Sequence, residues 1–185
     1  CAKGWLRNLL CVAEANQLHI ASPAMVEGEL NYDFADWAQK AEADMKGYIR
    51  KNAPHAVCMA IREDVWGEIG YFMPVPKLLG YEDGIFFQRA KEAGLKTGTT
   101  ADAWLHHYGM ITQKALKLEK ALDQRDSLGS RNLMRLYMNQ TWVARKLARF
   151  NRRSMLAKVR KFELANFGKT IHAINRQEGI AWDWV

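Results

Sequence analysis

The chain has 185 residues, of which 49% are hydrophobic and 11% aromatic. This is enough for one domain with a packed core, and it excludes disorder over the whole length. No apolar run approaches the roughly 20 residues that span a bilayer, and we recognise no signal peptide. The three cysteines, Cys1, Cys11 and Cys58, lack the C-x-x-C spacing and leave an odd thiol, which indicates reduced cytoplasmic thiols rather than disulfides or a zinc site.

The formal net charge of +7 is unevenly distributed. Residues 1–112 carry 11 Lys and Arg against 14 Asp and Glu, a net charge of −3, whereas residues 113–185 carry 16 against 6, a net charge of +10. This asymmetry predicts a C-terminal surface that meets phosphate groups, an acidic partner or a membrane. Because Cys1 leads almost at once into a helical pattern, we expect the chain to be a fragment or processed remainder of a longer protein.

The first part of the chain predicts helices and strands in alternation. Apolar residues at helical spacing indicate a helix over residues 4–16. The short apolar run at 19–23 predicts a buried strand stopped by Pro23, followed by a loop over 24–36. A mostly charged segment with an apolar stripe predicts a second helix over 36–50.

The pattern continues in the same way to residue 112. An apolar run at 56–61 has the length of a strand, and residues 62–70 predict a short helix that ends at glycine. A further helix is expected at about 84–93, because acidic residues precede it and glycine follows it. Residues 95–100 and 103–107 predict two short strands, and from residue 113 onward the pattern is helical.

The most informative stretch runs from Cys58 to Thr112. After the strand and short helix comes Gly80-Tyr81-Glu82-Asp83-Gly84, which opens a helix that ends before Gly94, and the stretch closes with His106-His107-Tyr108-Gly109-Met110-Ile111-Thr112. This ordered series strongly resembles the second half of family-2 glycosyltransferases of the GT-A fold. Those proteins have a strand ending in arginine, a short helix, a Glu-Asp pair that opens a helix, and a histidine before a Gly-x-x-Thr turn.

The start of the chain fits the same register. Lys3-Gly4-Trp5-Leu6 resembles the helix that follows the family's metal-binding Asp-x-Asp, and Ile20-Ala21-Ser22-Pro23 resembles the next core strand. The resemblance implies an α/β fold over residues 1–112: a partial GT-A (Rossmann-like) mixed sheet with flanking helices, the acceptor-side half of a glycosyltransferase domain. A basic, all-helical extension is expected over 113–185.

This resemblance also implies an activity: transfer of a sugar from a nucleotide-sugar donor to a hydroxyl of a glycan, lipid or protein acceptor, inverting and dependent on Mg²⁺ or Mn²⁺. In the family's register the nucleotide-binding strands and the Asp-x-Asp lie before Cys1, and the chain contains no Asp-x-Asp. This departure puts the independent activity of the chain in question.

Glu82 and Asp83 stand where a loop becomes a helix, a position at which backbone amides and the helix dipole favour anionic side chains. Inverting transfer needs one carboxylate that takes the proton of the acceptor hydroxyl as its oxygen attacks the anomeric carbon. The resemblance implies that Asp83 is this base and that Glu82 supports it or contacts the acceptor. The alternative is that both residues only cap a helix.

Two histidines follow the last predicted strand. Imidazole nitrogen and carboxylate oxygen both ligate divalent cations, and in GT-A enzymes a late histidine can complete the metal shell or touch the diphosphate. The spacing His107-Tyr108-Gly109-x-x-Thr112 makes His107 the first candidate and His106 the second. A strand-end histidine bonded to the backbone is the alternative.

Aromatic side chains flank the acidic pair, and aromatic faces suit sugar rings. Tyr81 and Trp66 are the candidate acceptor contacts, with ordinary core packing as the alternative.

The basic tail is amphipathic over 142–161, a segment that contains no acidic residue. It predicts either a surface that lies on an anionic membrane or a helical hairpin whose charges are solvated. Nucleic acid is a weaker alternative, because no recognisable RNA- or DNA-binding motif is present. A second function therefore stays open: a non-catalytic basic helical module that docks on an anionic membrane surface or an acidic partner.

Overall fold

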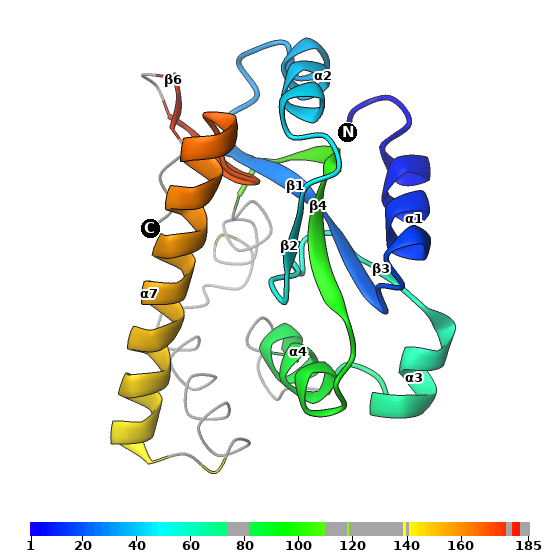
Figure 1. Cartoon of the computed structure of the whole chain (residues 1–185), viewed down its shortest axis with the longest axis vertical. Coiled ribbons are helices and arrows are strands. Elements are labelled where there is room, and N and C mark those ends of the chain that lie inside the picture. The colour runs from blue at the N-terminus through cyan, green and yellow to red at the C-terminus, as the bar shows by residue number, and fades with distance from the viewer. Residues whose placement is uncertain (74–81, 110–117, 119–138, 140, 177–178, 182–185) are drawn as a thin grey trace.

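The computed structural model describes residues 1–73, 82–109, 118, 139, 141–176 and 179–181 (Figure 1). These residues form one mixed sheet with helices around it. The strands are β1 (Ile20–Gly28), β2 (Ile49–Lys51), β3 (Ala60–Ile61), β4 (Thr97–His107), β5 (His172–Arg176) and β6 (Gly179–Ala181). The helices are α1 (Trp5–Ala15), α2 (Phe34–Asp44), α3 (Glu63–Ile69), α4 (Glu82–Glu92) and α7 (Trp142–Phe167). The predicted α/β class, with a mixed sheet and flanking helices, is confirmed.

Strand β1 lies at the centre of the sheet, whose order is β2-β4-β1-β5-β6. β4 pairs in parallel with one edge of β1. On the other edge of β1, β3 pairs antiparallel with the first two residues of β1, and β5 pairs in parallel with its last four residues. The prediction that Pro23 stops this strand is wrong. Pro23 falls where the partner changes from β3 to β5, and at such a break in the ladder a residue without an N–H is tolerated.

Strand β4 is continuous where the sequence predicted two strands. The register moves from Pro23 opposite Thr100 to Ala24 opposite Trp104, so residues 101–103 of β4 bulge out against a single step of β1. A bulge bends a strand and turns its later side chains in a new direction. Figure 1 shows this bend, after which β4 ends in His106 and His107.

Helices α1 to α4 confirm the helical predictions, with bounds that differ by a few residues. α2 begins at Asp33, whose side chain accepts a hydrogen bond from the Asp36 backbone N–H at 3.1 Å, as an N-cap does. Gly70 and Gly94 follow α3 and α4 with φ of 71° and 70°, values that glycine adopts without strain. The second helix ends earlier than expected because β2 occupies its last predicted residues.

Separate core clusters anchor these helices to different parts of the sheet. α2 packs on the face that carries Val26 and Trp104, whereas α3 and α4 pack at the start of β1 around Ile20. Phe86 and Ala90 of α4 are fully buried in this second cluster. The N-terminal turn of α4 is therefore anchored through the amino-terminal part of β1.

The C-terminal third contains the basic helix that the sequence predicted, but an all-helical extension is not confirmed. α7 ends at Gly168, which has φ of 66°, and the chain then forms β5 beside β1 and the short β6 antiparallel to β5. Side chains 171–173 are buried in the sheet, and this burial stabilises a strand more than it would stabilise a further turn of helix. The predicted helical residues from 113 to 138 lie outside the described residues, apart from Leu118.

Candidate functional site

The parallel strands β1 and β4 end together, and we call their last residues, Glu27, Gly28, His106 and His107, the carboxyl edge. Glu27 and His107 are register partners, and so are Val26 and His106. Because partners on adjacent strands point to the same face, Glu27 and His107 share one face of the sheet and His106 lies on the other. In open α/β sheets ligands bind outside the carboxyl ends of the strands, so this edge is the first candidate for a site.

His106 is fully engaged within the protein. Its Nδ1 lies 3.0 Å from the Tyr32 hydroxyl and its Nε2 lies 2.9 Å from the Gly28 carbonyl oxygen. These partners define a tautomer in which Nε2–H donates to Gly28 and Nδ1 accepts from Tyr32. Burial lowers the pKa of His106, and burial raises the pKa of Tyr32 to about 12, so both groups stay neutral. His106 therefore has no nitrogen to offer a metal without breaking one of these bonds.

His107 differs from its neighbour. Its Nδ1 is buried and has no hydrogen-bond partner among the described residues. A buried polar atom without a partner is costly unless something outside the chain satisfies it. Gly109, with φ of 63°, lets the chain turn closely past the same face, since a Cβ there would lie 2.8 Å from Oε1 of Glu27. Of the two predicted metal ligands, the geometry favours His107.

The structure adds two histidines that the sequence analysis did not single out. His172 begins β5 opposite Met25, and its Nε2 lies 3.6 Å from Oε2 of Glu27. The His55 ring meets the His172 ring edge-on at 4.9 Å, and Ser22 holds the His55 backbone with two hydrogen bonds. These contacts join chain segments far apart in sequence, so no local sequence pattern indicated them.

Both added histidines are kept neutral. Burial, followed by the charge of Arg50, lowers the pKa of His55 to about 4. The pKa of His172 is lowered to about 2, first by burial and then by electrostatic interaction with His55, Arg50, His107 and Arg160. Neutral imidazoles can accept a proton or bind a cation, which imidazolium cannot.

We expect acid to destabilise the fold through these two histidines. Their pKa values lie below the ordinary 6.5, so below pH 6.5 the unfolded chain binds protons that the folded chain does not. Stability is therefore full above about pH 6.5 and falls by up to about 1.4 kcal/mol per pH unit for each histidine as the pH decreases towards 4. Urea unfolding between pH 6.5 and 5 measures this slope. His55→Gln should reduce this slope, and a slope equal to that of the unchanged chain would contradict the assignment.

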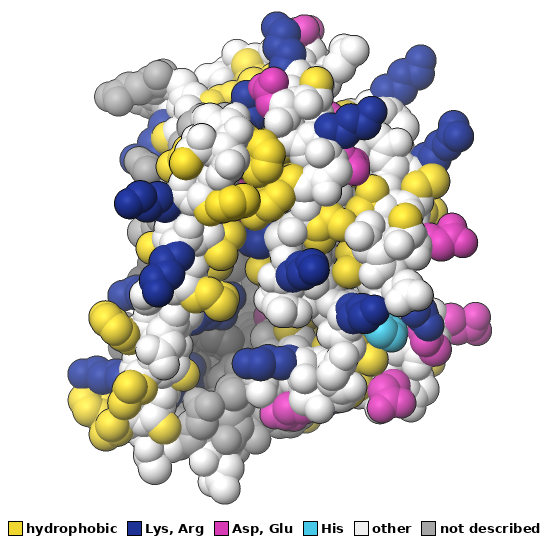
Figure 2. Space-filling model, in the orientation of Figure 1, with side chains coloured by type: hydrophobic (Ala, Val, Ile, Leu, Met, Phe, Trp, Pro, Cys, Tyr) yellow, Lys and Arg dark blue, Asp and Glu magenta, His cyan; other side chains and the backbone are white. Residues whose placement is uncertain are grey.

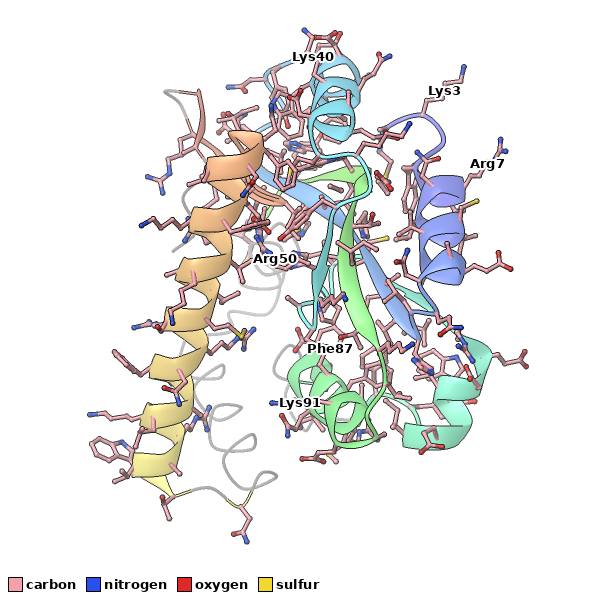
Figure 3. All side chains as sticks on the ribbon, in the orientation of Figure 1. Lys3, Arg7, Lys40, Arg50, Phe87 and Lys91 are labelled. Carbon is pink, nitrogen blue, oxygen red and sulfur yellow. The ribbon has the colours of Figure 1, made fainter. Side chains whose placement is uncertain are left out.

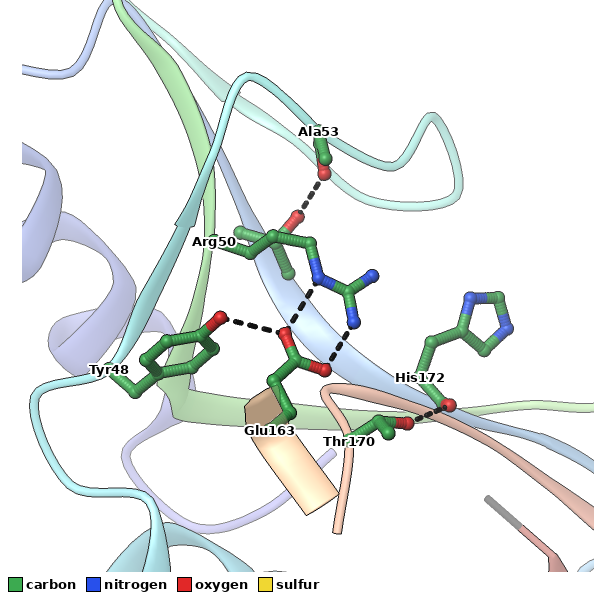
Figure 4. Close-up of polar contacts among 7 residues, drawn as sticks. Tyr48, Arg50, Ala53, Glu163, Thr170 and His172 are labelled. Atoms are coloured by element: carbon green, nitrogen blue, oxygen red, sulfur yellow. Dashed lines mark hydrogen bonds and ion pairs between the residues drawn. The ribbon is translucent and has the colours of Figure 1, made fainter. Parts of the chain in front are cut away.

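A buried ion pair lies beside this cluster and joins α7 to the sheet (Figure 4). Arg50 of β2 donates from Nε to Oε1 of Glu163 at 2.8 Å and from its terminal nitrogen to Oε2 at 2.5 Å. The Tyr48 hydroxyl donates to Oε1 at 2.8 Å. Glu163 is completely buried and Arg50 is 8% exposed. This pair fixes the C-terminal half of α7, and with it the start of β5 that carries His172.

The predicted catalytic pair opens α4. Asp83 lies at helical spacing from the packed residues Phe86 and Ala90, and it is half-buried, so its side chain faces the body of the protein rather than open solvent. Its Oδ1 accepts the Gly84 backbone N–H at 2.6 Å, and Glu82, also half-buried, is in the first turn of the same helix. α4 packs at the amino end of β1 and the carboxyl edge lies at the other end, and no described hydrogen bond or ion pair joins Asp83 to either histidine. The catalytic roles of both acids stay predictions.

Of the two predicted acceptor contacts, Tyr81 lies outside the described residues. Trp66, on α3, is half-buried against the second core cluster and stacks on Tyr71 with ring centroids 5.3 Å apart. Tyr71 itself is 74% exposed. Trp66 thus has a packing role, and its contact with an acceptor stays a prediction.

The fold and this edge define an α/β protein with an open mixed sheet whose candidate site lies at the carboxyl ends of parallel strands. No family model, curated protein or solved structure matches the chain. Among the described residues, no three His, Cys, Asp or Glu side chains are grouped to hold a metal ion, and no helix has the length and apolarity to cross a membrane.

Proposed function

We propose that the chain is the acceptor-side part of a GT-A glycosyltransferase, which transfers a sugar from a nucleotide-sugar to an acceptor hydroxyl with inversion. The observation that carries the proposal is the carboxyl edge, where half-buried His107 has a buried Nδ1 with no partner among the described residues, on the same face as the carboxylate of Glu27. The ordered motif series from Cys58 to Thr112 supports it. Asp83 is half-buried in the first turn of α4, the position that this motif series assigns to the base.

In this proposal the residues have separate tasks. Asp83 takes the proton of the acceptor hydroxyl while the acceptor oxygen bonds to the anomeric carbon, and the bond from that carbon to the donor phosphate breaks. Glu82 supports the loop or contacts the acceptor, and Trp66 and Tyr81 offer aromatic faces to a sugar. The acceptor hydroxyl belongs to a glycan, a lipid or a protein.

A divalent cation fits this edge only in part. His107 and Glu27 are ligands of suitable type for Mg²⁺ or Mn²⁺, whereas His106 is occupied by Tyr32 and Gly28. Two protein ligands do not complete the coordination shell of such a cation, so donor phosphate oxygens and an Asp-x-Asp would have to supply the remaining ligands. Such a cation stabilises the charge that develops on a leaving diphosphate.

The test is a transfer assay on the full-length gene product with a panel of nucleotide-sugars and Mn²⁺. We expect cation-dependent transfer, and His107→Gln should raise the Mn²⁺ requirement by at least the roughly 10–100-fold that loss of a supporting group costs. His19→Gln is the control, since His19 lies at the amino end of β1. If the full-length product binds no nucleotide-sugar, the proposal fails and the non-catalytic basic module is favoured.

A further inference from the structure

Three apolar side chains project from α7 away from the rest of the protein. Val143, Leu147 and Phe150 are 58%, 57% and 70% exposed. Their spacing of i, i+4 and i+7 places them on one stripe of the helix, within an arc of about 60° at roughly 100° per residue. We call these three residues the outer stripe of α7.

The outer stripe is not the face through which α7 packs. The least exposed residues of the helix include Val159, Glu163 and Phe167, and Glu163 is held by Arg50 and Tyr48. At the same angular step, this packed face points roughly opposite to the outer stripe. The apolar residues therefore do not serve the packing of α7 on the sheet, and their exposure needs another explanation.

At the same angular step, Lys146, Arg153 and Lys158 flank the outer stripe, and no exposed acidic residue lies on α7. The exposed cations of the helix are Lys146, Arg149, Arg152, Arg153, Lys158 and Lys161. The single acid of α7, Glu163, is buried and neutralised by Arg50. Figure 2 shows Lys and Arg side chains along α7, at the left of the view, with hydrophobic side chains among them. Trp142 begins the helix, 61% exposed, with Nζ of Lys146 3.9 Å from its ring centre.

We infer that the outer stripe of α7 and its flanking cations bind an anionic lipid surface. A helix that lies in a membrane interface buries apolar side chains at the boundary of headgroups and acyl chains and sets its cations against lipid phosphates. A tryptophan at one end, beside a lysine, is typical of that boundary. The inference is independent of the proposed function, because it uses only the helix and its charges.

Other occupants explain less of this surface. An acidic protein or a nucleic acid would satisfy the cations, but single-stranded nucleic acid is held by aromatic stacking in a basic groove, and two of the three stripe residues are aliphatic on a convex helix. Burial of valine and leucine in hydrocarbon is favourable, and anionic headgroups attract the arginines and lysines at the same time. Charge complementarity and exposed apolar area together favour lipid.

The experiment is flotation of the full chain with vesicles. We expect it to float with phosphatidylcholine vesicles that contain about a third phosphatidylserine, and to stay behind with pure phosphatidylcholine. Lys146→Gln with Arg153→Gln should weaken binding by on the order of 30-fold, since each cation near the surface contributes roughly fivefold. The matched control is Lys3→Gln with Arg7→Gln, which removes two exposed cations at α1, on the far side of the molecule from α7 (Figure 3).

The apolar part of the inference has its own pair of variants. Leu147→Ser with Phe150→Ser should abolish flotation at moderate salt. Leu6→Ser with Leu10→Ser should leave flotation unchanged, although Leu6 and Leu10 are an exposed apolar pair on α1, at 50% and 49%. Circular dichroism confirms that each variant is folded. Equal flotation with neutral vesicles, loss in the control pairs, or binding of single-stranded RNA that vesicles do not compete away would overturn the inference.

Discussion

Replacing Glu163 with glutamine should lower the free energy of unfolding by about 3 kcal/mol or more, although the two side chains are nearly the same size. The reason is the state of Arg50, which stays buried and charged after its partner is neutralised. Two hydrogen bonds now join the guanidinium to the carboxylate, and burial together with the bond to Glu163 raises the pKa of Tyr48. Urea unfolding at pH 7, followed by circular dichroism, measures the loss.

Two controls separate the buried charge from the loss of packing. The double variant Arg50→Met with Glu163→Leu removes both charges and should recover most of the stability, because a buried ion pair can often be replaced by apolar side chains at little cost. Lys40→Met removes the cation of the exposed Lys40–Asp36 pair and should change little (Figure 3). If Glu163→Gln unfolds like the unchanged chain, α7 is not held on the sheet by this pair.

The sequence analysis described the C-terminal third incompletely, because part of its structure depends on residues far away in the sequence. The helical pattern of 142–167 is local, and it predicted α7 correctly. A five-residue strand such as β5 has little local signal, and it forms because β1 offers a free edge about 145 residues earlier. Glycine at 168, which ends α7, was the available clue. The continuous β1 and β4 were missed for a related reason, since proline and a bulge are tolerated only in a particular ladder.

The residues of the candidate site also fall into those that the sequence analysis named and those that it did not. The sequence ranked His107 above His106 as a metal ligand, because His107 ends a strand in a recognisable motif. His106 is bonded to Tyr32 and Gly28, and metal binding by His107 stays a prediction. Glu27, His55 and His172 were not found. They meet only through parallel pairing and loop packing between distant segments, for which one sequence contains no direct signal.

Asp83→Asn should reduce transfer by the full-length gene product about 10²–10⁴-fold, the range that a positioned general base contributes. Asparagine keeps the shape of the side chain, and its amide oxygen can still accept the Gly84 N–H, so the start of α4 should form as before. The amide cannot take up the acceptor proton. The binding of the donor should be unchanged, so the loss should be in kcat with little change in KM for the nucleotide-sugar.

A matched variant distinguishes the base from a helix cap. Asp64 is the second residue of α3 as Asp83 is of α4, and both helices begin with a Glu-Asp pair. Asp64→Asn removes the same charge from a helix start, and we expect it to leave transfer near the unchanged rate. The transfer rate of Glu82→Gln should lie between those of Asp83→Asn and Asp64→Asn, with a larger effect on KM for the acceptor. Near-normal transfer by folded Asp83→Asn would show that this carboxylate serves α4 and not the reaction, because the favourable interaction with the helix dipole is the one role that the two aspartates share.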